Sequence, residues 1–126
     1  MPALRIVDSI TELGEADAGC IAVSGSHGGI SSARFALVAR PLFSVFNDAG
    51  IGKDQAGIAA LDFLQGHGLA AATVSHTSAC IGQARSTLQE GIVNHVNALA
   101  SALGLFAGQR CFDAVRTLQT HPERPE

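Results

Sequence analysis

The sequence has few charged residues and lacks the two largest polar aromatics, and both shortages exclude classes of partner. Only 15% of the 126 residues are Asp, Glu, Lys or Arg, and neither Trp nor Tyr occurs. The formal net charge is −3, and the basic residues are scattered along the chain. We expect neither nucleic acid nor a membrane surface as a partner, because no basic patch would attract phosphate groups and no Trp or Tyr would stack on bases.

Long apolar runs and paired cysteines are also missing. No apolar stretch approaches the roughly 18 residues that a membrane-spanning helix needs. The first residues show no basic leader followed by an apolar segment, so we expect no signal peptide. The three cysteines, Cys20, Cys80 and Cys111, form no C-x-x-C pair. An odd and scattered set is typical of reduced thiols, which predicts a cytoplasmic protein.

What the sequence has in abundance is hydrophobic residues, at 47% of the chain. A soluble chain with so few charges is expected to cover part of its surface with copies of itself, so we predict a homo-oligomer. The length is typical of one domain. We expect a single α/β domain over residues 1–120, followed by a disordered polar tail (H-P-E-R-P-E) over 121–126.

Compact apolar runs alternate with helical patterns along this domain. Runs bounded by turn residues predict strands at 3–8, 20–24, 42–46 and 69–75. Helix signals predict helices from Ser31 or Ser32 to Arg40, from an Asp54 N-cap to about 65, from about 82 to 103, and over 109–118. This order predicts an α/β fold: a two-layer or three-layer sandwich with a mostly parallel sheet of about four strands and three to four helices.

The region 82–103 is predicted to be the longest helix. Five apolar residues in it recur every three or four positions, which is the period of an α-helix: Leu88, Ile92, Val96, Leu99 and Leu103. Gly91 inside a helix costs about 1 kcal/mol relative to Ala, which we attribute to a kink or a close helix crossing. The polar residues Asn94, His95 and Asn97 predict an internal hydrogen-bond network or a subunit contact. A capping box at Ser9 and Glu12 predicts a short helical turn near the N-terminus.

Two stretches of the chain are nearly the same. V-S-G-S-H-G-G-I-S-S-A-R runs from Val23 to Arg34, and V-S-H-T-S-A-C-I-G-Q-A-R runs from Val74 to Arg85. In each, a His follows a predicted strand and an Arg falls near the first turn of the next helix. Such an Arg, next to unpaired helical N–H groups, favours a bound carboxylate or phosphate. The alternative is chance similarity between two turns rich in Ser, Gly and Ala.

Ligands of open parallel sheets bind beyond the carboxyl ends of the strands, so we predict a pocket between the loops 25–32, 47–54 and 76–81. The candidate catalytic residues are two imidazoles for proton transfer and one thiol: His76, His27 and Cys80. The candidate substrate-binding residues carry hydroxyl, amide, charged or flexible backbone groups: Ser26, Gly28, Gly29, Arg34, Asn47, Asp48, Lys53, Thr77, Ser78 and Arg85.

Each of these candidates also has a purely structural interpretation. Cys80 is also typical of a buried small hydrophobe, and Lys53 of a solvated loop. The G-S-H-G-G segment is typical either of a phosphate cradle or of a tight turn that needs positive φ. His27, Asp48 and His76 form an acceptable donor set for a divalent metal, although none of them are spaced as a local pair.

The segment G-I-G-K-D, residues 50–54, is not a P-loop. Asp rather than Ser or Thr follows the Lys, and Asn47 stands where the first glycine belongs, which excludes a nucleoside triphosphate site.

The candidate residues taken together predict a small metabolic enzyme: a hydrolase, isomerase or lyase that acts on a compact anionic substrate bearing a carboxylate or amide. The alternatives are a non-catalytic protein that binds an anion or metabolite, and an accessory subunit of a larger assembly.

Overall fold

Five strands form one mixed sheet in the computed structural model, which describes residues 2–120. In chain order they are β1 (Leu4–Val7), β2 (Ile21–His27), β3 (Phe43–Asn47), β4 (Ala70–Val74) and β5 (Val93–Val96). Their order in the sheet is also β1-β2-β3-β4-β5, with β1 to β4 parallel and β5 antiparallel to β4. The α/β fold with a mostly parallel sheet is therefore confirmed, with one strand more than predicted.

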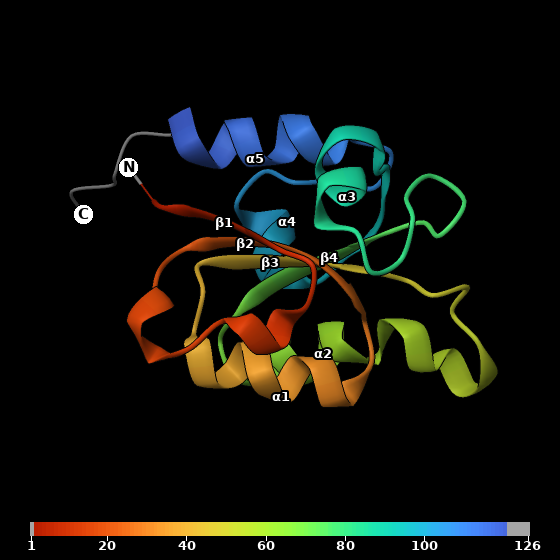
Figure 1. Ribbon diagram of the computed structural model, residues 1–126, viewed down its shortest axis with the longest axis horizontal. Coiled ribbons are helices and arrows are strands. Elements are labelled where there is room, and N and C mark those ends of the chain that lie inside the picture. The colour runs from red at the N-terminus through yellow and green to blue at the C-terminus, as the bar shows by residue number, and fades with distance from the viewer. Residues whose placement is uncertain (1, 121–126) are drawn as a thin grey trace.

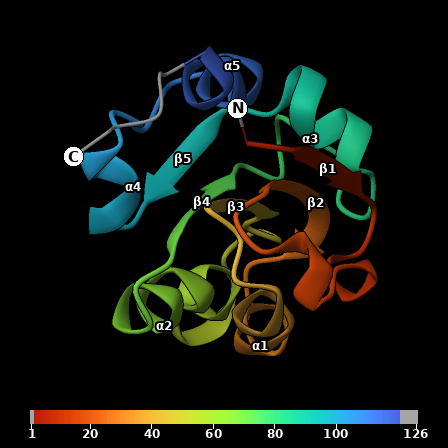
Figure 2. The same cartoon turned by 90° about the vertical axis from the view of Figure 1, so that its left-hand side faces the viewer.

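Helices cover both faces of this sheet and make a three-layer sandwich (Figures 1 and 2). One face carries α1 (Ile30–Ala39) and α2 (Ala59–Gly66), and the other carries α3 (Ala84–Glu90), α4 (Ala98–Ala102) and α5 (Cys111–Thr120). The connections from β2 to β3 and from β3 to β4 advance across the sheet in the same direction. Right-handed crossovers in one direction place their helices on one face, which accounts for α1 and α2 lying side by side.

The strands divide their side chains between two cores, as alternation along a strand requires. In β3, Phe43 and Val45 lie in the core beneath α3 to α5, and Phe46 lies in the core above α1 and α2. All three are fully buried. On the α1 side the buried helix residues are small, Ala33 and Ala36 among them, which allows the helix to lie close to the sheet. The core therefore holds the carboxyl ends of β2, β3 and β4 at one edge.

The prediction of one long helix over 82–103 is wrong, because this region contains α3, β5 and α4. The helix α3 ends at Gly91, its C-cap, whose backbone is extended with φ of −65° and ψ of 139°. A Cβ at this position would overlap the carbonyl oxygen of Thr87 and lie 2.8 Å from a methyl carbon of Val74, so the chain passes too close to β4 for a residue with a side chain. After Gly91 the chain forms β5, which contains the β-branched residues Val93 and Val96 and pairs with β4. Four members of the apolar stripe still reach one core, but they do so from three separate elements: Leu88, Val96, Leu99 and Leu103.

Smaller corrections concern where the other helices begin. The N-cap of α1 is Gly29, whereas Ser32 is buried inside the helix. The region after Asp54 is the 3-10 helix η3 (Lys53–Ile58), in which Asp54 and Gln55 have left-handed φ values of 55° and 59°, so α2 starts only at Ala59. The final helix, α5, begins two residues later than predicted.

The predicted turn near the N-terminus is confirmed as the 3-10 helix η1 (Ile10–Glu12), with the capping box of Ser9 and Glu12. A second 3-10 helix, η2 (Glu15–Asp17), follows it. None of the helices within residues 2–120 has both the length and the apolar character that a membrane crossing requires. The tail predicted over 121–126 lies outside the described residues.

Candidate functional site

The carboxyl ends of β2, β3 and β4 bring the predicted loops to one edge of the sheet, at the right in Figure 1. His27 at the end of β2 is in register with Asn47 at the end of β3, and Asn47 is in register with Val74 at the end of β4. His76 follows two residues later. The two histidine-bearing turns therefore lie on the same edge, with the loop after β3 between them.

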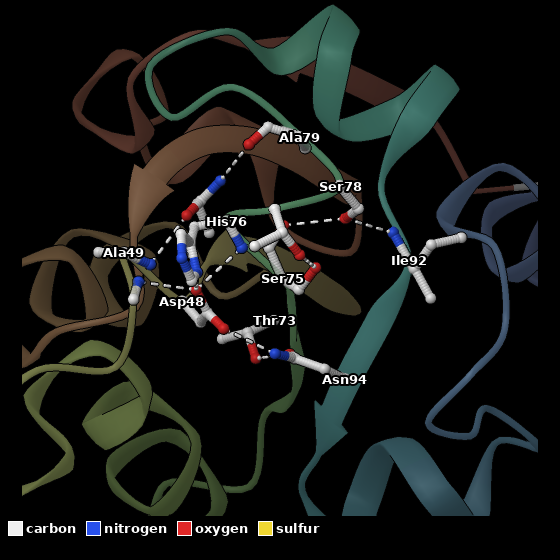
Figure 3. A network of polar contacts seen from close by, with 12 residues as sticks. Asp48, Ala49, Thr73, Ser75, His76, Ser78, Ala79, Ile92 and Asn94 are labelled. Carbon is white, nitrogen blue, oxygen red and sulfur yellow. Dashed lines mark hydrogen bonds and ion pairs between the residues drawn. The ribbon is translucent and has the colours of Figure 1, made fainter.

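Asp48 is the centre of the polar network at this edge (Figure 3). Its side chain is 4% exposed and accepts four N–H groups. Oδ1 accepts the backbone N–H of Gly50 at 2.8 Å, the backbone N–H of His76 at 3.0 Å and Nδ1 of the His76 ring at 3.1 Å. Oδ2 accepts Nδ2 of Asn94 at 2.7 Å.

These bonds determine the charge of Asp48. Burial by itself raises the pKa of its carboxyl group, but the N–H groups of Gly50, Asn94 and His76 outweigh burial and bring the pKa below its ordinary value. Asp48 is therefore an ionised carboxylate at neutral pH. A carboxylate oxygen can only accept, so Nδ1 of His76 carries the proton and Nε2 is left as the basic nitrogen of the ring.

A second layer of polar groups fixes this arrangement. Thr73 Oγ1 donates to Asn94 Oδ1 at 2.7 Å, which orients the Asn94 amide so that its nitrogen points to Asp48. Asn47 is fully buried, donates from Nδ2 to the carbonyl of Ala79 and accepts the N–H of Ala49. The hydrogen-bond network predicted at Asn94 is confirmed, but it lies next to β4 and Asp48 and not inside a long helix. Sequence reasoning missed Thr73, because it assigned this residue to an ordinary buried strand.

A cavity of about 410 Å³ lies next to His76. The lining residues come from the loops after β3 and β4 and from the end of α3: Asn47, Ala49, His76, Thr77, Ser78, Ala79, Cys80, Ile81 and Glu90. The side chain of His76 is 53% exposed, and Cys80 is an exposed free thiol. The cavity therefore combines an oriented base with a thiol, hydroxyl groups and one carboxylate.

Two lining side chains have structural partners. Ser78 Oγ donates to the carbonyl of Ser75 at 2.8 Å and accepts the N–H of Ile92 at 2.9 Å, so it braces the loop against β5. Glu90 accepts from Ser86 Oγ, which in turn accepts the backbone N–H of Cys80 at 2.9 Å. This chain holds the backbone at Cys80 next to the cavity.

The predicted cationic residues are not brought into this cavity. Arg34 lies in the middle of α1 and Arg85 at the start of α3, on helices that cover opposite faces of the sheet (Figure 2). Both residues are exposed, as is Lys53. Arg34 is also not in the first turn of its helix, so the expected anion site built from two matching arginines is not formed within this chain.

The predicted metal set is also not assembled. Within residues 2–120, no group of three His, Cys, Asp or Glu side chains lies close enough to hold a metal ion. The reason is that the ring of His27 packs against the start of α1, whereas His76 and Asp48 bind each other across β3 and β4.

Ser26 accepts the N–H of Ile10 at 2.9 Å and so connects β2 to η1.

The glycines of the G-S-H-G-G segment serve close packing rather than positive φ. Neither Gly28 nor Gly29 is among the positive-φ glycines of the chain. A Cβ on Gly28 would overlap the carbonyl oxygen of Gly57, and one on Gly29 would lie 2.8 Å from Nδ1 of His27.

Comparison with protein-family models, with curated proteins and with solved structures found no match to this chain. The chemistry of the site is therefore inferred from its geometry alone.

Proposed function

We propose that the protein is an enzyme that moves protons on a compact substrate bound next to His76. The observation that carries this proposal is the hydrogen bond from His76 Nδ1 to the buried, ionised Asp48. Three further N–H groups hold this carboxylate in place. A histidine that acts as a general base uses such a carboxylate, because the carboxylate fixes the ring and stabilises the imidazolium that forms when Nε2 takes a proton.

Proton abstraction by Nε2 is a step common to hydrolysis, isomerisation and elimination, so these three reaction classes remain within the proposal. Cys80 lines the same cavity, which favours a role in holding or attacking the substrate. Among the described residues that line this cavity, Glu90 contributes a carboxylate and no Lys or Arg contributes a positive charge. We therefore narrow the substrate to a neutral carbonyl or amide compound, in place of the strong anion expected from the sequence.

The test is proton NMR of small ketones, esters and amides incubated with the protein in D₂O at neutral pH. This measurement reports hydrolysis and also the exchange of C–H protons for deuterium, which a general base catalyses. We expect one or more compounds to react with the wild type and to lose about 10²- to 10⁴-fold in rate with His76→Gln. His67→Gln is the matched control, because His67 is exposed at the end of α2. Equal rates for wild type and His76→Gln on every reactive compound would refute the proposal.

We also propose that the chain associates with copies of itself. The outer face of α1 supports this, because Phe35 and Val38 are 45% and 58% exposed there. A surface helix ordinarily presents polar residues to water. Sedimentation should show an oligomer for the wild type, and Val38→Glu should shift it toward monomer if α1 forms the contact. A wild-type monomer at micromolar concentration would count against self-association.

The three free thiols support the cytoplasmic location predicted from the sequence.

A further inference from the structure

A second cavity, of about 460 Å³, lies on the other side of the loop after β3. Its lining residues are His27, Gly29, Ile30, Ala49, Ile51, Gly52, Ala56, Gly57 and Ala59. Every one of them except His27 is aliphatic or glycine. Ala49 lines this cavity and also the cavity next to His76. The two cavities are thus neighbours, with Ala49 between them.

His27, the one polar side chain among the described residues that line this cavity, is fixed in one tautomer. The backbone N–H of Gly29 donates to Nδ1 of His27 at 3.0 Å. Since a backbone amide is always the donor, Nδ1 must be the accepting nitrogen, and the proton of the neutral ring lies on Nε2. His27 is therefore the reverse of His76, in which Nδ1 carries the proton and Nε2 accepts.

The Nε2–H group of His27 has one long contact, which a ligand oxygen at normal hydrogen-bond distance would replace. This contact is with Ser32 Oγ, which lies 3.3 Å from Nδ1 and 3.5 Å from Nε2. An oxygen almost equally far from both ring nitrogens lies away from the direction in which either one bonds, because those directions diverge in the plane of the ring. His27 is also exposed, so an incoming acceptor can reach it.

Ile51, which also lines this cavity, has a strained backbone. Ile51 has a φ of +67°, a conformation that β-branched residues rarely adopt. Two short hydrogen bonds of 2.6 Å hold it there, one from its N–H to the carbonyl of Asp48 and one from the N–H of Gly57 to its own carbonyl. Gly57 is required for this, because a Cβ would overlap the carbonyl oxygen of Asp48. Strain of this kind is typical of loops that position a ligand.

We propose that this second cavity binds a neutral, mainly apolar group that carries one acceptor oxygen, such as a cyclic or branched ketone or an ester. The aliphatic wall accommodates the carbon skeleton, and His27 Nε2–H donates to the oxygen. The described residues that line this cavity include no Asp, Glu, Lys or Arg, so neither an anion nor an ammonium group would find an oppositely charged side chain there. Because Ala49 lines both cavities, this group would be the non-reacting end of a substrate that reacts at His76. That last connection rests on the proposed function, whereas binding to the cavity does not.

Titration of the ¹⁵N-labelled protein with three six-membered-ring compounds tests this proposal. Cyclohexanone is neutral with an acceptor, cyclohexylamine is a cation, and cyclohexanecarboxylate is an anion of similar size. We expect cyclohexanone to bind most tightly and to shift the amide signals of Gly29 and Gly57. His27→Phe keeps a ring but removes the donor, and should weaken cyclohexanone about fivefold, the effect of one neutral hydrogen bond.

Two further variants complete the test. Ala56→Leu fills the cavity from the exposed side of η3 and should abolish the shifts without touching His27, which keeps the proposal testable if His27→Phe does not fold. His76→Gln should leave unchanged the affinity read from the amide signals of Gly29 and Gly57, which line the second cavity, so a failure of this site and a failure of the catalytic proposal are distinguishable. Tighter binding of cyclohexanecarboxylate than of cyclohexanone, or undiminished binding by both His27→Phe and Ala56→Leu, would overturn the assignment.

Discussion

Replacing Asp48 by Asn should reveal how much the buried carboxylate contributes to folding. The amide oxygen of Asn can keep the three donors that now bind Oδ1, from Gly50 and His76. Its nitrogen would then face Asn94, whose amide must turn over, and the Thr73 hydroxyl would change from donor to acceptor. Every partner is retained in this rearrangement, but the four bonds no longer involve a charge.

The expected loss follows from that change. Hydrogen bonds to a charged group contribute about 1.5–3 kcal/mol, against about 0.5–1.5 kcal/mol for neutral pairs. Three of the four bonds share one oxygen, and the His76 ring is half exposed to water, so their contributions do not add in full. We therefore expect Asp48→Asn to lower the free energy of unfolding at neutral pH by about 2 kcal/mol. A domain of this size has about 5–15 kcal/mol in total.

The pH dependence has a definite sign. The pKa of Asp48 in the folded protein lies below its ordinary value, so the folded state favours the charged form. Its stabilisation is therefore fully present above the unfolded pKa of about 4 and disappears as the pH falls through the folded pKa. The difference between wild type and Asp48→Asn should be constant near neutral pH and shrink in acid.

The assay is urea unfolding followed by circular dichroism, because the chain has no Trp or Tyr to serve as a fluorescent probe. Asp62→Asn is the matched control, since Asp62 is an exposed carboxylate on α2. A loss below about 0.5 kcal/mol for Asp48→Asn, or a difference that grows as the pH falls, would refute the reasoning.

Three further predictions concern other parts of the molecule. Asn97 is 6% exposed, and its amide makes four hydrogen bonds to backbone groups. Asn97→Ala should therefore lower the free energy of unfolding, measured in urea, by about 3–4 kcal/mol, and a loss below about 1 kcal/mol would contradict this. Gly91→Ala should lower the free energy of unfolding by about 2 kcal/mol through overpacking. If a helix ran through this position, Ala would instead stabilise the protein, so a rise in the thermal midpoint would contradict the prediction. Iodoacetamide should label exposed Cys80 in the native protein, while buried Cys20 and Cys111 should react only on unfolding. Burial raises the pKa of the Cys111 thiol to about 12, so detection of labelled Cys111 in the native protein by mass spectrometry would contradict this prediction.

Local patterns determined most of the architecture. The four parallel strands lie where compact apolar runs meet turn residues, because such runs are stable only when both faces of the sheet are covered. The same reasoning located the edge of the sheet where His27, Asp48 and His76 lie, since parallel strands all end on one side. The capping box of Ser9 and Glu12 could also be predicted from the sequence, because its two residues are only three positions apart.

Only the tertiary structure decided which of these residues act together. Asp48 and His76 are 28 residues apart in the chain, and Asp48 and Asn94 are 46 apart, so no local spacing predicts that they bind each other. Periodicity also failed at Gly91, because an apolar stripe of helical period can be assembled from a helix, a strand and another helix that face one core. The helix α3 ends at Gly91, where the chain lies close to Val74 of β4, and the strand that follows brings Asn94 to Asp48. Sequence alone therefore placed reactive groups along one edge of the sheet, whereas long-range packing selected the pair that forms a base.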